Sequence, residues 1–276
     1  MLWLQLRNEL WKLFGKKRTY IGFLMFLLTQ CTVVLIAKFQ GLKNMRSTLV
    51  GNGYAPEEFI TSLTVATLML IPIAMMMLPL YVSLVGGDMV AKEAEDGTLR
   101  MILSRPISRL RLLMVKWLAG VIFSISCAIC LGAFGVLFAQ ILFPWGGMFA
   151  FMPGLFSVFS PSDGLIHYTW AVLMMALNAT TIMTLAFMFS CFNVKPAAAT
   201  ILGLSFIFLN IILMNIPFFE DIQHWFLTYH LNLWQLMLAQ PIPVARIWES
   251  VSILTGFNLT FLVVGCTVFQ LRDIKS

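Results

Sequence analysis

Residues 61–85 have the sequence TSLTVATLMLIPIAMMMLPLYVSLV, without one charged side chain. A helix of about 20 apolar residues crosses the hydrocarbon core of a bilayer, because it rises 1.5 Å per residue. The apolar residues are continuous rather than alternating with a period of two, which favours a helix over a strand of a membrane barrel. We therefore predict a membrane-spanning helix here, with its regular geometry disturbed at Pro72 and Pro79.

Five further apolar stretches of similar length occur along the chain. Of the 276 residues, 60% are hydrophobic and only 11% are charged, whereas soluble domains carry about 25% charged residues. The sequence thus predicts an all-α integral membrane protein with six spans, forming a single transmembrane domain over residues 1–276. The predicted spans run from about Tyr20 to Ala37, Thr61 to Val85, Trp117 to Phe143, Tyr168 to Phe189, Ala197 to Ile216 and Ser250 to Phe269.

The distribution of Lys and Arg predicts the orientation. Fourteen of the 18 basic residues lie before the first span, between spans two and three, between spans four and five, or after span six, and four lie in the other connections. Connections rich in Lys and Arg stay in the cytoplasm. We expect a multi-pass protein of the plasma or inner membrane with both termini in the cytoplasm. This bias explains the net charge of +6, so a nucleic-acid partner is not needed to account for it.

Two connecting segments indicate helices that lie along the membrane surface. In residues 1–19, apolar side chains such as Leu6 and Leu13 recur at helical spacing, and Trp3 and Trp11 are typical interfacial anchors. We predict an amphipathic helix on the cytoplasmic face there. Residues 217–249 mix aromatic and polar residues, which favours short interfacial or re-entrant helices on the outer side before span six.

The cytoplasmic segment 86–111 concentrates charge between spans two and three. Acids come first, at Asp88, Glu93, Glu95 and Asp96, and bases follow. We expect Asp88 to Glu95 to begin a short helix, because negative charge suits a helix N-terminus. Gly97 then interrupts the helix, and Pro106 holds Arg105 out of helical geometry. Charge alone leaves two roles open: docking a soluble partner, or anchoring the loop to anionic lipid headgroups.

The order of residues in this segment resembles that of type-2 ATP-binding cassette transporter permeases. In that family an acid, E-x-G-T-L, a short apolar run, P-[VI]-S-R and a Lys follow one another. The sequence GDMVAKEAEDGTLRMILSRPISRLRLLMVKW presents the same order, with Asp96 at the variable position before Gly97. The matching residues are Glu93, Glu95, Gly97, Thr98, Leu99, Pro106, Ile107, Ser108, Arg109 and Lys116. An amphipathic N-terminal helix, six spans and the final FQLRDI also resemble the family.

The resemblance implies a function and a set of partners. Such permeases work as pairs, either two copies or two homologous chains, with two copies of a separate ATPase subunit. A coupling helix after span two docks in the ATPase and transmits its movement to the spans, commonly for export. ATP and Mg would be held by the partner, and this chain would carry no cofactor of its own. The expected docking or hinge residues are Glu93, Glu95, Asp96, Gly97, Thr98 and Arg105.

Catalytic and metal-binding patterns give little support for an enzyme. The sequence contains no G-x-x-x-x-G-K-[ST], HExxH or GxSxG motif, so a phosphate cradle would have to come from another polypeptide. Cys127 and Cys130 form a C-x-x-C inside a span, and 18 Met residues could bind Cu(I). Packing against lipid and neighbouring helices explains both more simply. We predict neither a catalytic residue nor a metal site, and three functions stay open: a transporter subunit, a non-transporting membrane anchor or scaffold, and an intramembrane enzyme.

Polar residues within the spans are candidates for a substrate pathway. Such residues face the bundle interior or a cavity rather than lipid, although each could equally serve hydrogen bonding between helices. Deep charges are absent from these stretches, which suits an apolar or amphipathic cargo, and the sequence does not identify that cargo. The candidate pathway residues are Asn178, Thr181, Asn210, Asn215, Thr255 and Asn258.

Overall fold

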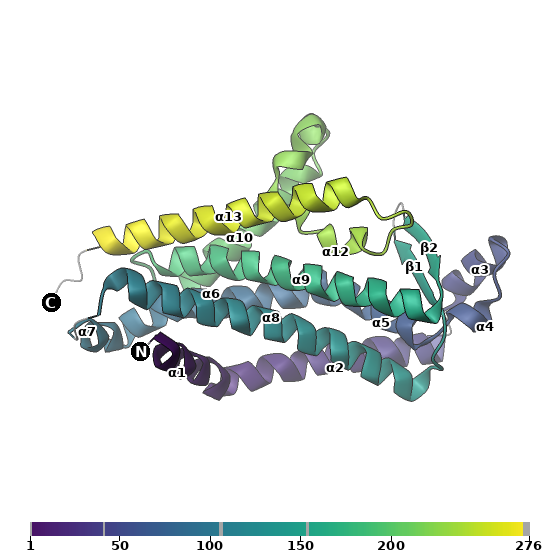
Figure 1. Cartoon of the computed structure of the whole chain (residues 1–276), viewed down its shortest axis with the longest axis horizontal. Helices are drawn as coiled ribbons and strands as arrows, with labels where there is room; N and C mark the ends of the chain where they lie inside the picture. Colours follow the sequence, from purple (N-terminus) through teal and green to yellow (C-terminus); the bar gives the residue numbers. More distant parts are fainter. Residues whose placement is uncertain (1, 41, 105–106, 153–154, 273–276) are drawn as a thin grey trace.

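A computed structural model describes residues 2–40, 42–104, 107–152 and 155–272. Long helices lie side by side in one elongated bundle (Figure 1). Six of the described helices are long and apolar enough to cross a membrane, which confirms the predicted number of spans and the multi-pass character. The spans are Thr19–Gln40, Ser62–Glu95, Arg109–Leu142, Pro161–Ser190, Pro196–Met214 and Val244–Leu271.

The elements follow the chain in a simple order. Helix α1 (Leu2–Gly15) precedes α2 (Lys17–Gln40), the first span, and the short helices α3 (Lys43–Gly51) and α4 (Pro56–Phe59) follow. The second span comprises α5 (Ser62–Pro72), a π-helix η1 (Ile73–Met77) and α6 (Leu78–Glu95). After it come α7 (Thr98–Leu103), α8 (Arg109–Leu142), β1 (Met148–Met152), β2 (Leu155–Phe159), α9 (Pro161–Ser190), α10 (Pro196–Met214), the 3₁₀ helix η2 (Pro217–Trp225), α11 (Leu227–His230), α12 (Leu233–Leu236) and α13 (Val244–Leu271).

The second span changes its helix type at the place where the sequence predicts a disturbance. Pro72 ends α5, and the next five residues form the π-helix η1 before α6 resumes regular geometry. Proline has no amide hydrogen to donate, so the ladder of backbone hydrogen bonds must be rearranged around it. Single-turn π-helices inside long helices are frequent at functional positions.

Helix α9 forms the centre of the bundle. Within its most apolar stretch, 78% of the residues are buried, against 44% or less in the other five spans. It packs against α6, α8, α10 and α13. The contact with α6 is close because Gly86 has no side chain: a Cβ atom there would lie 2.4 Å from the backbone oxygen of Met183.

The two ends of the bundle differ in composition. Helices α3 and α4 and the antiparallel hairpin of β1 and β2 lie at one end, and α1, α7 and the last turn of α13 lie at the other (Figure 1). The hairpin was not predicted; its Phe149 is buried against Met45 and Leu49 of α3. Residues 217–249 do contain short helices, namely η2, α11 and α12. Figure 1 also shows the green segment of α10 and η2 projecting from the side of the bundle.

One local prediction is wrong. Asp88 to Glu95 do not begin a separate short helix but form the last turns of α6, continuous with the second span. Carboxylates are unfavourable at a helix C-terminus, where the helix dipole is negative. Lys92 offsets this repulsion, because its Nζ lies 3.0 Å from Glu95 Oε2 and 3.2 Å from Asp96 Oδ1.

Candidate docking site at the α6–α7 end

A sharp turn at Gly97 joins α6 to α7. Gly97 has a φ of +73°, a left-handed conformation that glycine adopts without the steric cost of a Cβ atom. Two residues at the start of α7 attach it to the rest of the structure. Thr98 Oγ1 donates to the Glu93 carbonyl oxygen of α6 at 3.3 Å, and the Leu99 side chain is buried, with only 2% exposed. Helix α7 is therefore fastened to the end of the second span rather than hanging from it.

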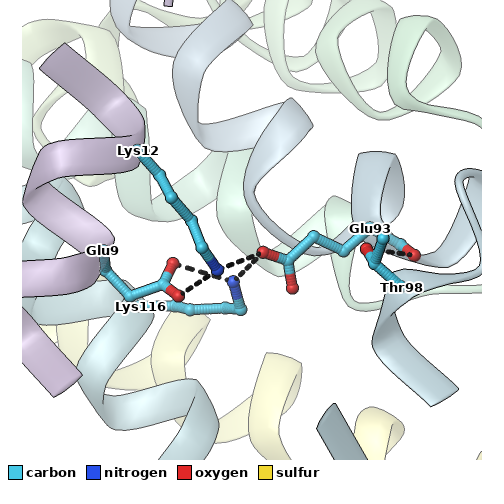
Figure 2. A network of polar contacts seen from close by, with 5 residues as sticks. All are labelled: Glu9, Lys12, Glu93, Thr98 and Lys116. Atoms are coloured by element: carbon cyan, nitrogen blue, oxygen red, sulfur yellow. Dashed lines mark hydrogen bonds and ion pairs between the residues drawn. The ribbon is translucent and has the colours of Figure 1, made fainter. Parts of the chain in front are cut away.

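A network of four charged side chains connects α6 to two other helices (Figure 2). Lys116 of α8 lies at its centre, with its Nζ 2.9 Å from Glu9 Oε2 and 2.7 Å from Glu93 Oε1. Lys12 of α1 contacts the same two acids, at 2.7 Å from Glu9 Oε1 and 3.2 Å from Glu93 Oε1. The ion pairs therefore join α1, α6 and α8 next to the turn that carries α7.

The charged side chains of this network are largely buried, which is unfavourable unless they are paired. The Lys116 side chain is 1% exposed, and those of Glu9 and Glu93 are 13% and 18% exposed. Burial would raise the pKa of the Glu9 carboxyl, but attraction to Lys116 and hydrogen bonds from Lys12 and Lys116 lower it. Burial would lower the pKa of Lys12, but its contacts with Glu9 and Glu93 raise it. Both groups are charged at neutral pH, since buried charges are tolerated when they are paired.

A cleft of about 910 Å³ opens beside the network, between α1, the end of α6 and α7. Its lining includes Glu9, Lys12, Lys92, Glu93 and Asp96. Within the described parts of the chain, the buried Oε2 atom of Glu93 has no hydrogen-bond partner. Glu93 therefore combines one carboxylate oxygen that binds both lysines with one that is buried and unpaired, at the edge of this cleft.

The exposed surface around the Gly97 turn is acidic and partly apolar. The side chains of Glu95 and Asp96 are 44% and 50% exposed, and Met101 on α7 is 66% exposed. We call Glu95, Asp96 and Met101 the α7 face. Glu93, Glu95, Asp96, Gly97 and Thr98 are thus close together, as expected of neighbours in sequence, but Glu93 points inward to Lys12 and Lys116. Arg105 lies outside the described residues.

The predicted pathway residues do not converge on one place. Asn258 of α13 donates its Nδ2 hydrogen to Thr181 Oγ1 of α9 at 2.7 Å, so these two tie neighbouring helices together. Asn178 donates instead to the Leu231 carbonyl oxygen and lines a separate cavity. The remaining three residues bond to carbonyl oxygens of their own helices: Asn210 to Phe206, Asn215 to Ile211 and Thr255 to Val251.

Three residues of the network were not singled out as site residues. Glu9 and Lys12 belong to the predicted amphipathic helix, where charged residues are expected on the polar face. Lys116 belongs to the quoted motif but was given no role. The signal that could have identified it is its position, directly before the apolar run that begins at Trp117, because a Lys there must find a partner. Its partners are far away in sequence, which explains why the pattern did not supply them.

The described residues hold no group of three or more His, Cys, Asp or Glu side chains that could bind a metal ion. His230 is buried, with its Nε2 2.8 Å from the His224 carbonyl oxygen and its Nδ1 3.0 Å from Ser250 Oγ. A carbonyl oxygen only accepts, so Nε2 carries the hydrogen and Nδ1 accepts from the hydroxyl. Burial lowers the pKa of this imidazole, which makes it a neutral structural residue.

Six apolar helices and a charged cluster at one end define a mostly helical, multi-pass membrane protein. The predicted all-α class is corrected in one respect, because the described residues also form the hairpin of β1 and β2. The chain belongs to DUF2705, a family described as proteins of unknown function, whose model matches residues 23–275. No curated protein matches the sequence as a relative.

The family match corrects the resemblance drawn from the sequence. Assignment to the type-2 ATP-binding cassette permeases is wrong, because the family covering residues 23–275 is DUF2705. The shared order of residues has a local physical basis. A long span that ends in a short surface helix favours glycine at the positive φ of Gly97. A helix that starts at Arg109 is helped by Ser108, whose Oγ accepts from the Arg111 amide.

Proposed function

We propose that this chain is the membrane-spanning subunit of a transporter powered by a separate ATPase, which docks on the α7 face. The observation that carries the proposal is the buried ion network of Glu9, Lys12, Glu93 and Lys116. It fastens the helix that bears α7 to two further helices. Such an arrangement passes a displacement of α7 to the spans, whereas a flexible loop would absorb it.

A displacement of α7 would reach the spans through the helices that precede and follow it in the sequence, α6 and α8. Helix α6 ends at Glu95, two residues before Gly97, and forms the part of the second span that follows the π-helix η1. Helix α8 begins at Arg109, shortly after α7 ends. A push on α7 therefore acts on spans two and three together, and η1 is the point in span two where the helix geometry can yield.

The chemistry of the α7 face suggests a partner with basic and apolar groups. Glu95 and Asp96 are held by Lys92 and still half exposed, and Met101 offers an apolar contact. The cleft beside them is lined by Asp96 and Glu93, and the half-exposed Asp96 carboxylate is open to an incoming Lys or Arg. Energy would come from the partner, because the sequence has no phosphate-binding motif of its own.

The proposal includes an orientation and an assembly. The end with α1 and α7 would face the cytoplasm of a plasma or inner membrane, as the distribution of basic residues favours. Helix α1 would lie at the lipid interface, with the exposed Trp3 and Trp11 as anchors; η2 would lie at the opposite interface. A second permease copy or a homologous chain and two ATPase subunits would complete the complex, with the substrate pathway between the two permeases.

Reversing the charge of the α7 face is expected to remove the partner. The tagged chain would be recovered from its host membrane in mild detergent, beside a variant carrying Glu95→Lys and Asp96→Lys. Co-purified proteins would be measured by quantitative mass spectrometry. We expect an ATPase with the native chain and a loss of at least tenfold with the variant, because like charges across an interface repel strongly.

The matched control is Glu57→Lys with Glu58→Lys, the same charge reversal on α4 at the other end of the bundle. It should leave recovery of the ATPase unchanged. Equal recovery with both variants, or no ATPase with the native chain, would rule out docking at the α7 face. Recovery of an ATPase whose turnover is the same with and without this chain would instead support the anchor or scaffold hypothesis.

A further inference from the structure

A partly open cavity of about 250 Å³ lies against the central helix α9, with Met75 of its lining 62% exposed. Its walls come from η1 and the start of α6, from α9 and α10, and from the short helices before α13. We call it the α9 cavity. Most of its lining is apolar, including Met75, Met175, Ile182 and Trp234. No Lys, Arg, His, Asp or Glu is among the described residues that line it.

One polar group in this lining has an unused acceptor. Asn178 is 5% exposed, and its Nδ2 donates to the carbonyl oxygen of Leu231, another lining residue. That bond fixes which side of the amide is oxygen. The Oδ1 atom is buried and has no hydrogen-bond partner in the described structure. Leaving a buried acceptor unsatisfied costs free energy, so this atom points to a donor supplied from outside the chain.

Another wall of the α9 cavity is the irregular part of the second span. Ala74 and Met75 of the π-helix η1 line the cavity, together with Leu78 and Pro79. A regular α-helix would place these side chains differently, because the π-turn inserts one extra residue into the helix. The irregularity of span two and the unpaired acceptor of α9 therefore meet in one cavity.

We propose that the α9 cavity binds a small apolar molecule that carries one hydrogen-bond donor, such as a hydroxyl group. The volume limits the size of this molecule. An apolar protein cavity of about 150 Å³ holds one benzene molecule, so a cavity of about 250 Å³ holds a molecule with one or two small rings or a short alkyl chain. The donor bonds to Asn178 Oδ1. Thioethers of Met75, Met175 and Met214 provide a soft, polarisable surface around the apolar part.

The lack of charged side chains among the described lining residues indicates which class of ligand the cavity can bind. An ion would enter a cavity without a counter-charge, which is unfavourable in an apolar surrounding. A hydrocarbon without a donor would fit but leave Asn178 Oδ1 unsatisfied. The ligand is therefore neutral. None of the lining residues belongs to the α7 face or the ion network, so this inference holds or fails independently of ATPase docking.

Photolabelling of the purified full chain in lipid nanodiscs tests the proposal. The probes are octan-1-ol carrying a diazirine in its chain and octane carrying the same diazirine, which differ only in the hydroxyl group. Labelled peptides are identified by mass spectrometry. We expect saturable labelling by the alcohol of peptides containing Met175, Met214 or Trp234, with competition by unlabelled octan-1-ol. The alkane should label them about three- to tenfold less, the factor that one hydrogen bond supplies.

Three variants distinguish the contribution of the Asn178 hydrogen bond to labelling from that of the cavity volume. Asn178→Leu should reduce labelling by the alcohol about three- to tenfold and leave the alkane unaffected. Ala74→Leu fills the cavity, keeps the Asn178 bond to Leu231, and should abolish labelling by both probes. Asn52→Leu is the matched control and should change neither, because Asn52 is an exposed asparagine after α3 that bonds to the Thr48 carbonyl oxygen and does not line the cavity. Equal labelling by the two probes on the native chain, or labelling that does not saturate, would overturn the proposal without any variant.

Discussion

Replacing Lys116 with Met is expected to lower the free energy of unfolding by about 3–5 kcal/mol, the usual result of removing one partner from a buried ion pair. The variant leaves Glu9 and Glu93 mostly buried, with only the half-exposed Lys12 to neutralise them. The measurement is reversible unfolding of the purified chain in mixed detergent, followed by circular dichroism. Methionine is chosen because it keeps most of the side-chain volume and removes the charge.

Two further variants show whether charge is the cause. Lys116→Met combined with Glu93→Gln removes one of the stranded carboxylates and should recover part of the lost stability. Lys92→Met removes two ion pairs on the surface, with Glu95 and Asp96, and should be close to neutral because exposed pairs contribute little. An effect of Lys116→Met no greater than that of Lys92→Met would mean that the network does not hold α1, α6 and α8 together.

Gly86→Ala is expected to destabilise the bundle by about 3 kcal/mol, at the upper end of the usual cost of overpacking. The added Cβ would lie 2.4 Å from the Met183 backbone oxygen and 3.1 Å from the Phe187 backbone nitrogen. Backbone atoms of the central helix cannot turn aside as a flexible side chain can. Helices α6 and α9 would have to separate, and among the described residues this is the most extensive contact between two helices.

The same substitution elsewhere provides the control. Gly256→Ala on α13 adds a Cβ that meets no atom within 4 Å, and it should stabilise the helix slightly, by about 0.5–1 kcal/mol. Both variants would be unfolded under identical conditions. Equal effects of the two alanines would contradict the close α6–α9 packing described above.

Contacts between residues far apart in the sequence were harder to predict than the membrane spans. Continuous apolar stretches indicate membrane helices directly, since lipid demands them, and all six are present. Local signals were also informative: Pro72 lies where the helix type changes, and Gly97 lies at the turn. Such features depend on the residue itself and its immediate neighbours.

Contacts between distant segments were not predictable in the same way. Glu93 was expected to face a partner, yet it pairs with Lys116 and Lys12, because the packing of α1 against α8 brings both lysines to it. The hairpin of β1 and β2 also escaped prediction, since its apolar, glycine-rich sequence resembles a loop lying on lipid. Thr181 and Asn258, both proposed as pathway residues, bond to each other between α9 and α13.

The most direct test of docking at the α7 face is photo-crosslinking in the native host membrane. The full chain would carry p-benzoylphenylalanine in place of Met101, which is 66% exposed on α7, or in place of Glu58 on α4 as the matched position. We expect an adduct between the Met101 position and a nucleotide-hydrolysing protein, and none from the Glu58 position. Crosslinks from the Met101 position to lipid or to other copies of this chain alone, with the ATPase absent or captured at Glu58, would contradict the proposed function.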